Sequence, residues 1–68
     1  MNNHDFDTVA DQLAAINETL AEAALDILSR AVKGDTRDLT VEKDLQRARR
    51  AVAKAESILR SITDERND

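Results

Sequence analysis

Apolar side chains recur every three or four positions in two long stretches of the chain, and a short polar segment separates the stretches. In residues 5–33 the recurring positions are Phe6, Val9, Leu13, Ile16, Leu20, Ala23, Ala24, Ile27 and Ala31. In residues 40–63 they are Val41, Leu45, Ala48, Val52, Ala55, Leu59 and Ile62. This spacing is typical of amphipathic helices with an apolar seam that faces a partner helix. The pattern therefore predicts an all-α chain of two helices.

The ends of the first stretch carry residues that start and stop helices. Asp5 can cap the helix, because its carboxylate accepts hydrogen bonds from the free amides of the first turn. Arg30 and Lys33 stand where the negative end of the helix dipole favours basic side chains. Gly34 follows them and can adopt the left-handed conformation without a Cβ clash. We therefore expect the first helix to end at about residue 33.

Residues 34–39 are expected to form the loop, and either Asp38 or Thr40 caps the second helix. The all-polar residues 64–68 are expected to fray. A loop this short makes the two helices antiparallel neighbours, so residues 1–68 should form a single helical hairpin. The seams then match layer for layer, with facing pairs expected at Val32 and Val41, Ile27 and Leu45, Ala24 and Ala48, Leu20 and Val52, Leu13 and Leu59, and Val9 and Ile62.

The length of the chain makes this hairpin incomplete on its own. A domain of 68 residues buries only about 60% of its unfolded surface and needs a further source of stability. The sequence has no cysteine for a disulfide, and the single histidine, His4, cannot build a zinc site within one chain. We expect no metal and no cofactor, and oligomerisation is the remaining remedy.

A second apolar stripe on the first helix indicates where such a partner binds. Leu25, Leu28 and Val32 lie beside the main seam, and one neighbouring helix cannot cover both. Leaving them in water would forgo about 1.5–3 kcal/mol for each side chain. A second copy would complete a four-helix bundle, with a dimer favoured and a different partner protein as the alternative. The expected interface residues are Phe6, Ala14, Ala21, Leu25, Leu28, Val32, Ala51 and Ile58.

The charges are divided unevenly between the two predicted helices. The net charge is −4, yet residues 39–63 contain six basic and three acidic side chains. Four of the basic residues form one stripe on the second helix, at i, i+4, i+7 and i+11: Lys43, Arg47, Arg50 and Lys54. A stripe of this kind can contact the phosphate backbone of a nucleic acid. It can also meet an acidic face of another copy or partner, or remain a solvated surface.

Two properties of the chain favour the solvated surface over a nucleic-acid site. Domains that bind nucleic acid are usually basic overall, whereas this chain is acidic. No aromatic side chain lies near the stripe to stack on bases, because Phe6 is the only aromatic residue.

The sequence offers no candidate catalytic site. It lacks cysteine, His4 lies in the terminal segment, and Ser29, Ser57 and Ser61 have no base nearby in the sequence. No basic segment leads into an apolar run, and no apolar stretch approaches membrane-spanning length, so we expect a soluble cytoplasmic protein. The expected function is a non-catalytic helical interaction protein that acts as a homo-oligomeric bundle. The alternatives are a nucleic-acid-binding accessory protein and an obligate small subunit of a larger complex.

Overall fold

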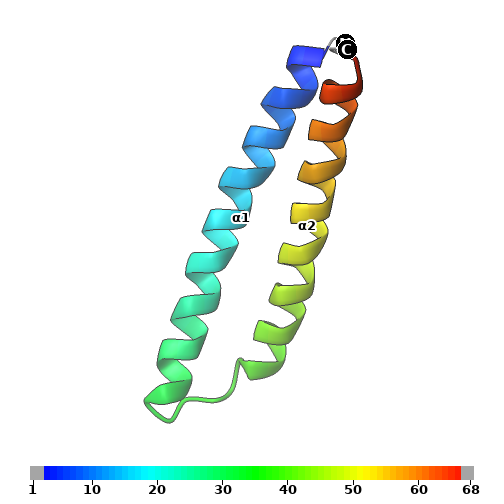
Figure 1. The fold of residues 1–68 in the computed structure, drawn as a ribbon. Coiled ribbons are helices and arrows are strands. Elements are labelled where there is room, and N and C mark those ends of the chain that lie inside the picture. Colours follow the sequence, from blue (N-terminus) through cyan, green and yellow to red (C-terminus); the bar gives the residue numbers. More distant parts are fainter. Residues whose placement is uncertain (1–2, 67–68) are drawn as a thin grey trace.

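The computed structural model describes residues 3–66 of the chain as two antiparallel helices joined by a short loop (Figure 1). Helix α1 is Asn3–Val32 and helix α2 is Leu39–Arg66. No strand occurs among these residues. The start of α1 and the end of α2 lie side by side at the end opposite the loop (Figure 1). The prediction of an all-α helical hairpin is confirmed.

The helix ends differ from the expected ones by a few residues. Helix α1 begins two residues before Asp5, so Asp5 lies in the first turn instead of capping it. Helix α2 begins at Leu39, and the amide of Glu42 donates to the carbonyl of Asp38 at 2.9 Å. Asp38 is therefore the N-cap residue, and Thr40 lies inside the first turn. The predicted polar tail is helical as far as Arg66, and its last two residues lie outside the described part of the chain.

Gly34 ends α1 as the sequence indicates. Its φ is +100°, in the left-handed region. The amide of Gly34 donates to the carbonyl of Ala31 at 3.0 Å, and that of Asp35 donates to the carbonyl of Arg30 at 2.9 Å. These two hydrogen bonds form a Schellman motif, which satisfies carbonyls that the helix end would otherwise leave free. The motif turns the chain out of the helix axis, so that α2 can fold back along α1.

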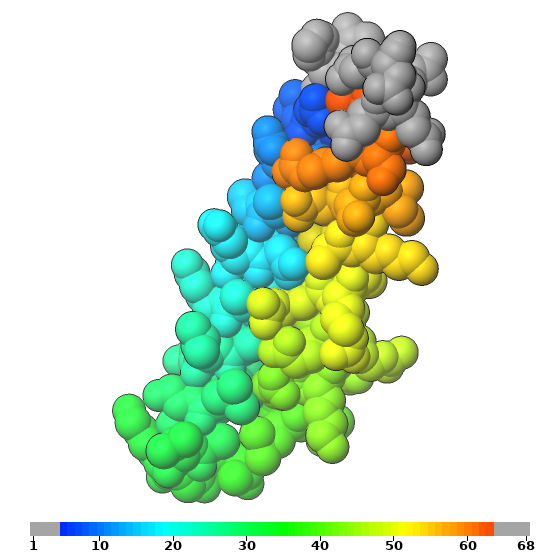
Figure 2. Space-filling model, viewed as in Figure 1, coloured from blue at the N-terminus to red at the C-terminus, as the bar shows by residue number. Residues whose placement is uncertain are grey.

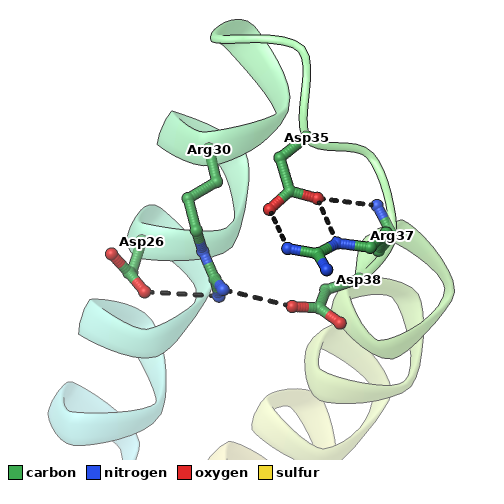
Figure 3. Close-up of polar contacts among 5 residues, drawn as sticks. All are labelled: Asp26, Arg30, Asp35, Arg37 and Asp38. Atoms are coloured by element: carbon green, nitrogen blue, oxygen red, sulfur yellow. Dashed lines mark hydrogen bonds and ion pairs between the residues drawn. The ribbon is translucent and has the colours of Figure 1, made fainter.

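Ion pairs hold the loop against both helices (Figure 3). Arg30 lies 3.3 Å from Asp26 in α1 and 3.3 Å from Asp38 at the start of α2. Within the loop, the guanidinium of Arg37 donates two hydrogen bonds to the carboxylate of Asp35, at 3.0 and 2.9 Å. These hydrogen bonds, together with one from the Arg37 amide, lower the pKa of Asp35. Exposed pairs of this kind contribute less than about 1 kcal/mol each, but together they fix the path of the loop.

The helices pack along their whole length into a narrow rod 52 Å long (Figure 2). The apolar core between them is small. Of the described residues, the buried apolar ones are Ala10, Ala24 and Ile27. The larger side chains that line the contact are only half-buried: Leu13, Leu20, Leu45, Val52 and Leu59. One hairpin therefore covers only part of its own apolar surface.

The expectation that the two seams face each other directly fails at four of the sixteen seam residues, and the expected layer of Val32 with Val41 does not form, because Val32 is 89% exposed. Ile16 is 49% exposed and Val41 is 55% exposed. Ala23 and Ala48 are exposed as well. Each helix is rotated about its own axis relative to the predicted contact, so these members of each seam lie outside it.

Polar side chains occupy part of the contact in their place. The side-chain amide of Asn17 donates to the carbonyl of Arg49 at 3.3 Å. The ion pair between Asp11 and Arg60 joins residues that lie within about one residue of level in the predicted register. Glu56 also lies half-buried beside the contact, because long side chains can bury their stems while the charged ends reach water.

Candidate interaction surface

One side of the hairpin is marked by an ion pair that joins the two helices. The Arg60 guanidinium lies 3.0 Å from the Asp11 carboxylate and 3.0 Å from that of Glu56. The hydrogen bond that Arg60 donates to Asp11, and the smaller effect of the one that it donates to Glu56, raise the pKa of Arg60. Both Asp11 and Arg60 are exposed, so the pair contributes little to stability. The pair lies on one side of the hairpin, which we call the polar flank.

A shallow hollow lies on the polar flank between the helices. Its volume is about 200 Å³, and it is lined by Ala14, Asn17, Glu18, Ala21, Arg49 and Glu56. Two buried atoms at this level, Oδ1 of Asn17 and Nε of Arg49, have no hydrogen-bond partner among the described residues. The hollow is open to solvent and larger than the space that one water molecule needs, so water can reach these groups. The hollow therefore requires no ligand to explain it.

The opposite side of the hairpin follows from helix geometry. Two residues along a helix correspond to a rotation of about 200°. Ile58 precedes Arg60 by two residues, and Ile16 follows Ala14 by two, so both point away from the polar flank. Ile58 is 50% exposed and Ile16 is 49% exposed. We call this side the apolar flank; its members are Val9, Ile16, Ala23, Val41, Ala48, Ala51, Ala55, Ile58 and Ile62.

The exposed seam residues of α1 and those of α2 lie on the same side of the molecule, the apolar flank. The remaining seam residues, such as Leu20 and Val52, lie between the helices. Both seams are therefore tilted toward one flank instead of pointing straight at each other.

The structure divides the predicted interface residues between the two flanks. Ala51 and Ile58 lie on the apolar flank. Phe6 is half-buried in line with Leu13, at the contact between the helices. The others follow one another at steps of seven, four, three and four along the side of α1 that borders the hollow: Ala14, Ala21, Leu25, Leu28 and Val32. A single flat contact covers only one flank, so the predicted set combines two surfaces.

Near the loop, the polar flank carries its own apolar patch. Leu25 is 67% exposed and Val32 is 89% exposed, while Leu28 and Leu39 are more covered. We call these four residues the loop-end patch. The patch is confined to one end of the rod, whereas the apolar flank extends along both helices. The sequence analysis identified Leu25, Leu28 and Val32 of the loop-end patch, and Ala51 and Ile58 of the apolar flank. It assigned the other members of the apolar flank to the core between the helices.

The basic stripe lies fully on the surface of α2. Lys43, Arg47, Arg50 and Lys54 are all exposed. Arg47 forms a loose ion pair with Asp44 at 3.6 Å. No ion pair to the other three is found among the described residues. The stripe thus presents cations that acids of the described chain do not neutralise.

Other kinds of site find no support in the described part of the chain. No group of three or more His, Cys, Asp or Glu side chains there is arranged to hold a metal ion. The side chain of His4 lies outside the described residues. Neither helix, over the residues described, is long and apolar enough to cross a membrane. No protein-family model, curated protein or solved structure matches the chain.

Proposed function

We propose that this chain is a non-catalytic helical interaction protein that works as a homodimeric four-helix bundle. The observation that carries the proposal is the tilt of both apolar seams toward one flank, where Ile16, Val41 and Ile58 are half exposed. In a four-helix bundle each helix packs against two neighbours, and its apolar face points between them to the bundle centre. Within one hairpin each helix has a single neighbour. A second hairpin bound to the apolar flank would give each helix its second neighbour.

The size of the apolar flank suits a second copy. The hairpin is 52 Å long and 16 Å wide, so one face offers on the order of 800 Å², which is what each partner of a stable interface buries. The face includes residues of both helices, from Val9 to Ala23 on α1 and from Val41 to Ile62 on α2, and an isologous contact between two equal hairpins can use it in both copies. A short partner peptide would leave much of this surface uncovered.

Size-exclusion chromatography with light scattering tests the proposal. At micromolar concentration we expect twice the chain mass of 7.6 kDa. The variant Ile16→Asp/Ile58→Asp should be monomeric, because it places two charges in the contact. A wild-type chain that is helical and monomeric at this concentration would overturn the proposal.

A nucleic-acid-binding accessory protein is the second candidate, favoured by the exposure of the basic stripe. Fluorescence anisotropy of labelled RNA and DNA at about 50 mM salt tests it, because phosphate contacts are strongest at low salt. Arg47→Glu/Arg50→Glu should abolish binding, while Arg37→Glu in the loop serves as a control outside the stripe. Absence of binding by the wild-type protein at this salt concentration would eliminate the candidate.

A further inference from the structure

The two halves of the apolar flank differ in polarity. On α2, the flank residues from Ala48 to Ile62 include no charged side chain, and the half-exposed Ile58 stands among them. On α1, the positions three residues after Val9, Ile16 and Ala23 are polar and exposed: Gln12, Thr19 and Asp26. The equivalent positions on α2, three residues after Val41, Ala48 and Ala55, are Asp44, Ala51 and Ile58. The apolar surface of α2 is therefore continuous from Ala48 to Ile62, whereas that of α1 is interrupted throughout.

Two hairpins can meet through their apolar flanks with two-fold symmetry in two ways. With both loops at the same end, each α1 packs against the partner subunit's α2. With the loops at opposite ends, α2 packs against the partner subunit's α2, and the two α1 helices pack against each other. In both arrangements adjacent helices are antiparallel, so helix direction does not choose between them.

The difference in polarity between the α1 and α2 halves of the apolar flank favours one of these arrangements. In the same-end arrangement, Gln12 and Thr19 would lose water against the apolar stretch of the partner subunit's α2, whose flank residues there are alanine and isoleucine and offer no side-chain hydrogen bond, which is unfavourable. In the opposite-end arrangement, apolar α2 meets apolar α2. The polar residues of α1 then meet each other about an axis near Thr19: Thr19 meets the partner subunit's Thr19, and Gln12 comes level with the partner subunit's Asp26, so that hydroxyl, amide and carboxylate groups can pair.

The position of the apolar residues along α2 agrees with the opposite-end arrangement. Ala53 lies at the middle of α2, which is Leu39–Arg66, and inside the apolar stretch from Ala48 to Ile62. A two-fold axis at this level therefore aligns the two rods over their full length. It also sets Ile58 opposite the partner subunit's Ala48, so that a large side chain fills the space beside a small one.

From these observations, and resting on the proposed function, we propose that the two hairpins dock with their loops at opposite ends and with α2 against the partner subunit's α2. One unfavourable contribution is the approach of Lys54 to the partner subunit's Lys54 beside the two-fold axis. Both lysines are exposed, so water and salt screen this repulsion.

A distance between two loop labels tests the arrangement. The chain has no cysteine, so Thr36→Cys in the exposed loop gives one spin label per subunit. Double electron–electron resonance should give a distance of about 50 Å, close to the rod length. A distance below about 30 Å, within twice the hairpin width, would overturn the proposal. Lys33→Cys, one turn earlier at the same end, provides a second label that should agree.

The test separates this inference from the proposed function. A dimer by light scattering with a short loop-to-loop distance overturns only the docking arrangement. A labelled chain that gives no dipolar signal and is monomeric by light scattering overturns both. Unlabelled wild-type protein run in parallel shows whether the label itself changes the mass.

Discussion

Truncation of Ile58 gives the most direct measure of the apolar flank. Ile58 is 50% exposed in the hairpin, so a partner can cover the other half of its side chain. Full burial of an isoleucine contributes about 1.5–3 kcal/mol, and half of this in each of two subunits again amounts to roughly 1.5–3 kcal/mol per dimer. Ile58→Ala keeps one methyl group, so the lower end applies, and we expect Kd to rise about tenfold.

Sedimentation equilibrium over a dilution series measures this change in Kd. Alanine has a higher helix propensity than isoleucine, so a loss of α2 helicity would not explain weaker association. Leu25→Ala is the matched control, because Leu25 is 67% exposed on the polar flank and loses a similar apolar volume. In the proposed dimer Leu25 stays in solvent, and its truncation should leave Kd unchanged.

Two results would refute this reasoning. An equal weakening by Ile58→Ala and Leu25→Ala would mean that the interface does not distinguish the flanks. A weakening by Leu25→Ala alone would place the partner on the loop-end patch, as the sequence first indicated. Circular dichroism on both variants ensures that any change in Kd concerns association and not helix content.

Two further predictions concern the loop. Gly34→Ala should lower the free energy of unfolding by roughly 1–2 kcal/mol, because φ is +100° there and no atom within 4 Å adds a clash. Chemical denaturation measures this, and Lys33→Ala should change it by less than about 0.5 kcal/mol. The pKa of Asp35 is lowered from its ordinary value of 3.8, so its contribution to stability is present above that pH and is lost as the pH falls below it. Asp35→Asn should therefore reduce the decrease in the denaturation midpoint between pH 5 and pH 2, and an unchanged acid profile would contradict this.

The sequence predicted the hairpin because its strongest local signals agree with each other. The three- and four-residue steps indicate two helices, and Gly34 marks the turn between them. The rotation of each helix about its axis was not predicted, because the periodicity does not say where the neighbour lies. A seam of leucine, isoleucine and valine is the same in a helix with one neighbour and in a helix with two.

Asn17 and Arg49 show which side-chain placements the sequence pattern does not predict. Read from the sequence alone, both lie beside an apolar seam and belong in solvent. In the structure both contribute to the contact between the helices, since the Asn17 amide reaches the Arg49 carbonyl. Such a placement depends on how much of each seam turns toward a further neighbour, which is a property of tertiary packing.

The small core of the hairpin links its folding to its association. Of the described residues, only Ala10, Ala24 and Ile27 are buried apolar ones, while the larger seam residues remain partly exposed. Covering the apolar flank with a second copy would therefore supply a substantial part of the apolar burial that keeps the chain folded. When folding and dimerisation are coupled, the unfolding temperature rises with protein concentration. We expect this rise between about 1 and 100 μM by circular dichroism, and its loss in Ile16→Asp/Ile58→Asp; an unfolding temperature that does not depend on concentration would mean that the hairpin is stable without its partner.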